Sequence, residues 1–119
     1  MKFFSFIFIS LLFLFSCRKD KVKTIQPEGD CTEEKSFQAD ILPILSNNCS
    51  TSGCHDANGQ SGGYIFETHD QISQNADKIL AAMRHETQPL MPQPQGEEQL
   101  EDSLSTSFEC WIEQGKLDN

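Results

Sequence analysis

Two cysteines and a histidine lie close together in the stretch "NCSTSGCHDANGQSGG", residues 48–63. Their pattern is Cys49, four intervening residues, Cys54 and then His55. Thiolate and imidazole groups are the usual ligands of zinc, and two nearby cysteines can also form a disulfide. Two cysteines followed directly by a histidine are typical of covalent haem attachment. The stretch therefore allows three interpretations: a metal site, a local disulfide with an uninvolved histidine, or a haem attachment site.

The spacing differs from the usual haem motif, in which two residues separate the cysteines. In an unbroken helix, side chains five positions apart diverge by about 140°, so the segment from Cys49 to Cys54 must bulge. The intervening residues are small, and Gly53 can adopt backbone angles that other residues avoid. The adjacency of Cys54 and His55, which would couple a thioether bond to an iron bond, is retained.

A methionine in a proline-rich segment is the second candidate. Three prolines in "HETQPLMPQPQG", residues 85–96, exclude a regular helix or a central strand. Because Pro92 restricts the backbone of the residue before it, Met91 is expected in a fixed, extended conformation. A methionine fixed in this way is an unusual use of a flexible residue; the alternative is that Leu90 and Met91 only pack against the core.

The first residues have the form of an export signal. Lys2 precedes an apolar run from Phe3 to Phe15, which is shorter than the about 20 residues that span a membrane. The sequence "LFSC" ending at Cys17 resembles a bacterial lipoprotein box, so we expect removal of residues 1–16 and lipidation of Cys17. The alternative is an ordinary signal peptide cut further along. The expected location is the bacterial cell envelope, as a periplasm-facing lipoprotein of either membrane.

Residues 17–34 are polar and are predicted to be a flexible tether, which leaves one domain over residues 35–119. A domain of this size buries only a marginal hydrophobic core. The chain has nine basic and eighteen acidic residues, a formal charge of −9. This charge argues against nucleic acid as a partner and favours basic docking proteins.

Five cysteines are an odd number for an exported chain. If Cys17 carries lipid and Cys49 and Cys54 serve the histidine motif, then Cys31 and Cys110 remain for a disulfide, which an oxidising compartment permits. Two alternatives stay open. Cys31 and Cys110 could be separate buried thiols, or Cys49 could bond to Cys54 and leave His55 without a role.

The rest of the chain predicts short helices and an all-α fold. Residues 41–48 follow Asp40 as a possible cap, with Pro43 in the first turn. Residues 69–85 and 100–116 each have apolar residues at helical spacing, and Gly115 offers a C-terminal stop. The two apolar faces consist of Ile72, Ala76, Ile79, Leu80 and Met83, and of Leu104, Phe108, Trp111 and Ile112.

Over about residues 31–117 the chain resembles the small cytochrome c domains of exported lipoproteins from Bacteroidetes-type bacteria. The segments that carry the resemblance are "FQADILPILSNNCSTSGCH", a Gly-Gly-aromatic segment, "KILAAMRH", "PLMP" and "CWIEQGK". The resemblance implies three to four short helices around one covalently bound haem c. It implies Cys49 and Cys54 as thioether anchors, His55 as the proximal iron ligand and Met91 as the distal ligand.

The remaining candidates have simpler interpretations. Met83 is expected in the core and is the first substitute for Met91 as a ligand. His69 is expected to be exposed, and His85 to favour the end of a helix through the helix dipole. The expected walls of the haem pocket are Trp111, Phe37 and Tyr64. The imidazole of His55 and the sulfur of Met91 are expected to face each other across it, roughly 4–5 Å apart.

These residues predict an electron carrier rather than an enzyme. With protein ligands on both sides of the iron, no coordination position is open to a substrate, and His/Met ligation raises the reduction potential. The partners would be redox proteins. The alternative function is a haem-free binding or structural module that contains disulfides. A zinc site is the third hypothesis, and it lacks an evident fourth ligand.

Overall fold

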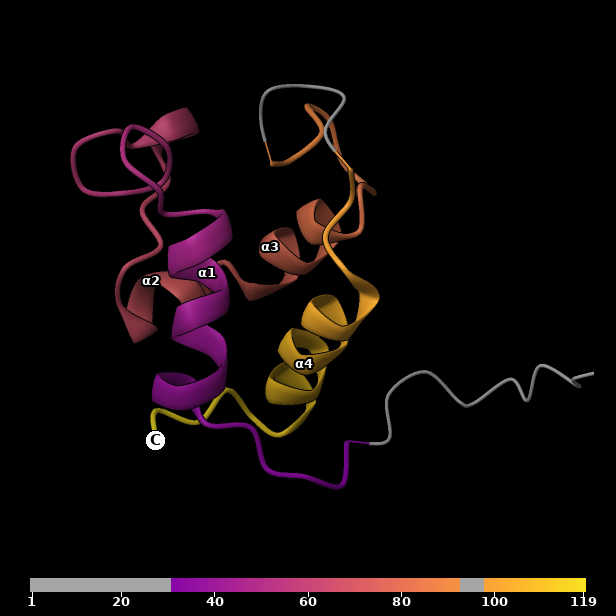
Figure 1. Ribbon diagram of the computed structural model, residues 1–119. Helices are drawn as coiled ribbons and strands as arrows, with labels where there is room; N and C mark the ends of the chain where they lie inside the picture. Colours follow the sequence, from indigo (N-terminus) through magenta and orange to yellow (C-terminus); the bar gives the residue numbers. More distant parts are fainter. Residues whose placement is uncertain (1–30, 93–97) are drawn as a thin grey trace, which may run out of the picture.

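The computed structural model describes residues 31–92 and 98–119, and within them every regular element is helical. The elements are η1 (Phe37–Ile41, a π-helical turn), α1 (Leu42–Asn48), η2 (Ser61–Gly63, a 3-10 turn), α2 (His69–Gln74), α3 (Ala76–Met83) and α4 (Asp102–Glu113). The predicted all-α fold is confirmed (Figure 1). None of these helices has the length and apolar character needed to cross a bilayer.

The first helical region begins earlier than the sequence suggested, because Ser36 rather than Asp40 is its cap. The Ser36 hydroxyl accepts a hydrogen bond from the backbone N–H of Ala39 at 3.2 Å. Asp40, which lies within this helix, also stabilises its start, because its carboxylate accepts a hydrogen bond from the Ser36 N–H at 2.8 Å. Two N–H groups at the helix start are thus satisfied reciprocally, and Pro43 lies in the first turn of α1, as predicted.

The predicted helix over residues 69–85 is divided into α2 and α3 at Asn75. Its backbone leaves the helical region, with φ −110° and ψ 11°, and its side-chain amide donates to the Gln71 carbonyl at 2.8 Å. An asparagine side chain competes in this way with the helical hydrogen bonds, which explains the break. The apolar stripe survives, since Ile72, Ala76, Ile79 and Met83 are all buried.

Helix α4 joins the two halves of the fold. It contacts η1 and α3, while α2 contacts α3 and α1 continues directly from η1 (Figure 1). Gly115 follows α4 with a φ of +95°, a conformation that suits glycine and ends the helix. Two loop regions, residues 49–66 and 87–92, lie together at the end of the molecule away from residue 31 (Figure 1).

The aromatic core lies around Trp111, which is completely buried and donates from its indole N–H to the Leu117 carbonyl at 2.9 Å. Phe37 and Phe108 pack on it with ring centroids 5.8 and 5.5 Å away. His69 belongs to the same cluster. Its ring meets Phe37 edge-on at 5.0 Å, and its Nε2 lies 2.8 Å from the Lys116 carbonyl. The expectation that His69 is exposed is therefore wrong.

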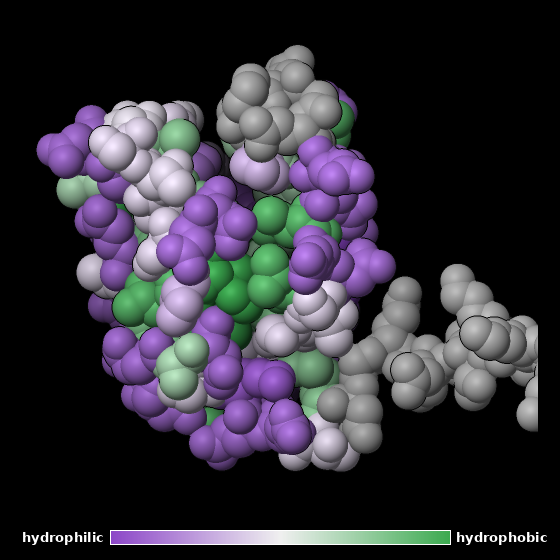
Figure 2. Space-filling view, in the orientation of Figure 1, coloured by the Kyte–Doolittle hydropathy of each residue, from purple (hydrophilic) through white to green (hydrophobic). Residues whose placement is uncertain are grey.

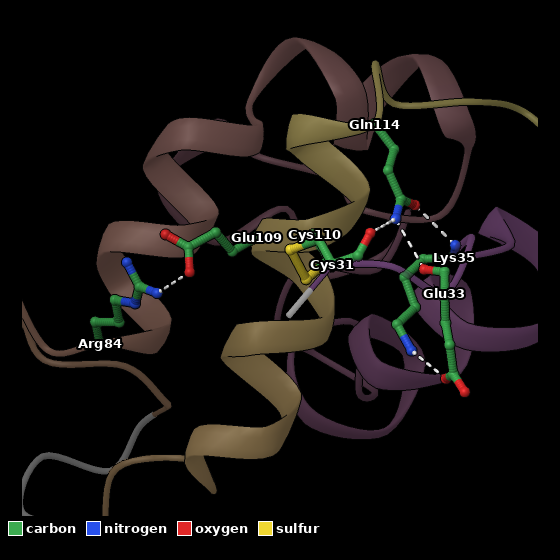
Figure 3. The surroundings of a disulfide bond; sticks show 7 residues. All are labelled: Cys31, Glu33, Lys35, Arg84, Glu109, Cys110 and Gln114. Atoms are coloured by element: carbon green, nitrogen blue, oxygen red, sulfur yellow. Dashed lines mark hydrogen bonds and ion pairs between the residues drawn. A yellow bond between two sulfur atoms is a disulfide. The ribbon is translucent and has the colours of Figure 1, made fainter. Parts of the chain in front are cut away.

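A disulfide between Cys31 and Cys110 joins the first described residue to α4, as the cysteine count predicted (Figure 3). Gln114 reinforces this junction. Its amide N–H groups donate to the carbonyls of Cys31 and Glu33, and its oxygen accepts from the Lys35 N–H at 2.8 Å. The beginning of the domain is thereby fixed to the last helix by one covalent bond and three hydrogen bonds.

Candidate functional site

A cavity of about 380 Å³ lies between the 49–66 loop, α3 and the 87–92 segment. This volume is within the range of small-molecule and cofactor sites. Its lining residues are Asn48, Cys49, Thr51, Cys54, His55, Ser61, Tyr64, Phe66, Lys78, Ile79, Ala82, Met83, Thr87, Gln88, Pro89, Met91, Pro92 and Leu100. On the face in Figure 2, apolar surface is visible in the hollow between the α1 side and the α3–α4 side.

The four residues selected from the sequence line this one cavity: Cys49, Cys54, His55 and Met91. The first three come from the loop after α1, and Met91 comes from the proline-rich segment after α3. Residues from two separate regions of the chain are thus brought to the same space. Met83, which is 3% exposed, also reaches the cavity from α3, so it is both a core residue and a second methionine at the site.

Of the three expected wall residues, only Tyr64 lines the cavity. Phe37 and Trp111 lie instead in the core cluster with His69, so their assignment to the wall was wrong. The physical reason is that both face the contact between η1 and α4, where burial of large rings holds these elements together. Phe66 lines the cavity instead, and its ring packs against His55.

The extended spacing between the two cysteines is accommodated by the expected bulge. The Cys54 N–H donates to the Thr51 carbonyl at 2.9 Å, and the His55 N–H donates to the Cys49 carbonyl at 3.1 Å. The second bond closes the loop at its base, so Cys49 and His55 remain neighbours despite the inserted residues. Gly53, with a φ of +82°, occupies the turn.

Asp56 and Gly59 hold this loop in shape. Asp56 is 9% exposed, and its Oδ1 accepts from the N–H groups of Gly53 at 3.1 Å and Gly59 at 2.7 Å. Gly59 packs directly on the motif, because a Cβ at this position would lie 2.3 Å from the Gly53 carbonyl carbon. Sequence reasoning overlooked Asp56, although an aspartate followed three residues later by glycine is a turn signal.

The ring of His55 is oriented from both sides. Its Nδ1 lies 3.3 Å from the Tyr64 carbonyl oxygen, and its ring packs on Phe66 with centroids 4.7 Å apart. A proton on Nδ1 would be donated to that carbonyl, which leaves the Nε2 lone pair free for a metal. Histidines that bind metals are commonly oriented by a backbone carbonyl in this way.

Cys49 and Cys54 are free thiols, both partly buried. Burial raises the pKa of Cys49 to about 11, with a further contribution from the nearby charge that Cys54 would carry as a thiolate. Cys49 therefore remains a neutral thiol at physiological pH.

The described residues contain no group of three or more His, Cys, Asp or Glu side chains that could hold a metal ion. Cys49, Cys54 and His55 thus do not converge on a common point, as a zinc site would require. Haem attachment makes no such demand, because the thioether bonds form at the porphyrin edge and only His55 and a residue on the opposite face contact iron.

His85 lies just after α3, with a φ of +56°, and does not line the cavity. Its Nε2 is buried and has no hydrogen-bond partner among the described residues. His85 therefore lies outside the group formed by Cys49, Cys54, His55 and Met91. Cys17 lies outside the described residues.

Comparisons with family models, curated proteins and solved structures give no match to this chain. The interpretation of the site consequently depends on the chemistry of its own residues.

Proposed function

We propose that the chain is a monohaem c-type cytochrome that transfers single electrons in the bacterial cell envelope. The observation that carries the proposal is that Cys49, Cys54, His55 and Met91 line one largely apolar cavity. When bound, haem supplies a one-electron iron couple. His55 and Met91 would hold it from opposite sides, and the two cysteines would attach it covalently, so a small domain could retain a large cofactor.

The local chemistry supports this assignment. Tyr64 and Phe66 fix the His55 ring, the proline-rich segment limits the freedom of Met91, and α3 contributes apolar surface through Ile79, Ala82 and Met83. A cavity of this kind suits an apolar disc, and an apolar surrounding stabilises the less charged, reduced state of the iron. These residues bind and orient; none is proposed as a catalyst.

The start of the described chain supports a role at a membrane surface. The coloured ribbon begins at the end of the domain opposite the cavity loops (Figure 1), and Cys31 is fixed to α4 by its disulfide with Cys110 and by the Gln114 amide. A lipid on Cys17 would then attach the domain to the membrane through the end that is away from its cavity. A redox partner in the periplasm would have free access to it.

The test is a pyridine haemochrome spectrum together with the intact mass of the full chain, exported in a host that attaches haem c. We expect one covalent haem per chain. His55→Ala should abolish the low-spin spectrum, whereas the matched control His85→Ala should leave it unchanged because His85 lies outside the cavity. Properly exported protein without haem, and two mass units lighter through a Cys49–Cys54 bond, would favour the haem-free module instead.

A further inference from the structure

The cavity contains one isolated positive charge. Among its described lining residues, Lys78 alone carries a fixed charge at neutral pH, and the others are apolar or uncharged polar groups. The protein as a whole is acidic, with eighteen acidic and nine basic residues, so an isolated cation at this site is not a consequence of the general surface composition. Lys78 extends from α3, and it is exposed, so it lies at the mouth of the cavity rather than in its interior.

Lys78 is held in place by Tyr64, which also lines the cavity. Its Nζ donates a hydrogen bond to the Tyr64 hydroxyl oxygen at 3.2 Å and lies 5.2 Å from the centroid of the same ring. A cation over an aromatic face gains about 0.5–1 kcal/mol at an exposed site. The ammonium group thus has a defined position across the cavity mouth, although its side chain is long and solvated.

Lys78 and Tyr64 have hydrogen-bond donors that remain after the hydrogen bond between them is formed. An ammonium group has three N–H donors, of which one is directed to Tyr64, and the Tyr64 hydroxyl still has its own proton to donate. Within residues 31–92 and 98–119, Lys78 forms no ion pair with a carboxylate. Lys78 and Tyr64 together therefore present up to three free donors and one positive charge beside an apolar cavity.

We propose that Lys78 and Tyr64 bind a carboxylate of the molecule that occupies the cavity, which is a haem propionate. This inference rests on the proposed function. An amphipathic occupant places its apolar body inside and its charged groups at the mouth, where charge-assisted hydrogen bonds are stronger than neutral ones. Lys78 and Tyr64 then act as positioning residues that orient the cofactor and add positive charge near the iron.

The experiment compares the midpoint potential of the full-length holoprotein with that of Lys78→Gln. Loss of the positive charge stabilises the oxidised iron, so we expect the equilibrium constant for reduction to fall about two- to fivefold, the range for an exposed ion pair. Lys35→Gln is the matched control. It changes the net charge equally, but Lys35 does not line the cavity. Lys78→Arg should restore most of the potential, and Tyr64→Phe should give a smaller decrease.

The outcomes separate this inference from the proposed function. A normal haemochrome spectrum with the same potential in Lys78→Gln and Lys35→Gln would overturn the Lys78 assignment and leave the cytochrome intact. Equal potentials for Tyr64→Phe and the wild-type protein would exclude Tyr64 from the contact. Absence of covalent haem from the wild-type protein would remove both proposals.

Discussion

Two methionines, Met83 and Met91, line the cavity, and the proposed haem needs only one of them as its distal ligand. Met91 is half-buried in the 87–92 segment, whereas Met83 is almost fully buried in α3 and packs in the hydrophobic core. A buried methionine contributes mainly through packing, and its replacement by alanine typically costs about 2–5 kcal/mol. The proline-restricted residue is the better candidate for a ligand, because its backbone is fixed before haem binds.

We therefore expect Met91→Ala to lose the sulfur–iron absorption band of the oxidised protein and to lower the midpoint potential, since methionine ligation raises it. Met83→Ala should retain both properties but unfold at lower urea concentration. Spectra, potentiometry and urea denaturation of the two variants provide the measurement. The reverse assignment of the two phenotypes would make Met83 the ligand.

Cys49 gives a prediction for the haem-free protein. Its pKa is raised to about 11 in the folded state, so the unfolded chain loses this proton at lower pH. The resulting stability is fully present below the unfolded pKa near 9 and is lost as the pH rises through 11. The loss amounts to at most about 2–3 kcal/mol, because one pKa unit corresponds to roughly 1.4 kcal/mol.

In Cys54→Ser, produced without haem, Cys49 is the one free thiol among the described residues, and the Cys49→Ser, Cys54→Ser double variant is its control. The free energy of unfolding should decrease between pH 9 and 11 more steeply in the single variant than in the double variant. Parallel curves would mean that the thiol of Cys49 is solvated in the folded protein.

At the scale of elements, the loop after α1 carries both cysteines and the histidine of the proposed haem site. With four residues between the cysteines, this loop has to be rigid to hold the three side chains in position. Asp56 and Gly59 provide this rigidity, one through two hydrogen bonds and the other through close backbone contact. Serine hydroxyls extend the network, since Ser50 donates to the Phe66 carbonyl at 2.7 Å. The loop is thus held by its own polar contacts, and we expect it to fold before any cofactor is attached.

Gly59→Ala and Gly53→Ala test this description as a pair. A methyl group on Gly59 would overlap the Gly53–Cys54 backbone, so we expect the loop to shift and the yield of covalent haem to fall severalfold. At Gly53 a methyl group meets open space, and its cost is the left-handed backbone, about 1–2 kcal/mol. Haem yield per folded chain is the measurement, and equal yields would argue against a preformed loop.

At the scale of the whole molecule, the domain is small and its helices are short, so the Cys31–Cys110 disulfide is a major source of stability. It closes the chain across a sequence separation of 79 residues. By loop-closure entropy, a loop of that length stabilises the folded state by about 4–5 kcal/mol. The ion pair between Arg84 and Glu109, at 2.6 Å, adds a weaker link between the end of α3 and α4.

Replacing both Cys31 and Cys110 by serine should therefore lower the free energy of unfolding by several kcal/mol. The haem spectrum of the folded fraction should be unchanged, because neither residue lines the cavity. Urea denaturation and the haemochrome spectrum measure the two quantities. A spectrum that changed with the disulfide would show that this distant junction shapes the site.

The sequence by itself determined what depends on local pattern. Helical spacing of apolar residues gave α4 and the stripe of α2 and α3, and the cysteine count gave the disulfide. The candidate residues Cys49, Cys54, His55 and Met91 were also visible as motifs, because their chemistry depends on residue type and close spacing.

Tertiary structure decided what depends on contacts between distant segments. It placed Met91 at the same cavity as His55, put Phe37 and Trp111 in the core with His69 packed against them, and brought Lys78 to Tyr64. Ser36 is the helix cap and Asp40 accepts from the Ser36 N–H, so each side chain serves a different donor once the helix begins at Phe37. The positions of Met91 and of the Phe37–Trp111 pair follow from the packing of the complete chain, because each depends on residues that are far apart in sequence.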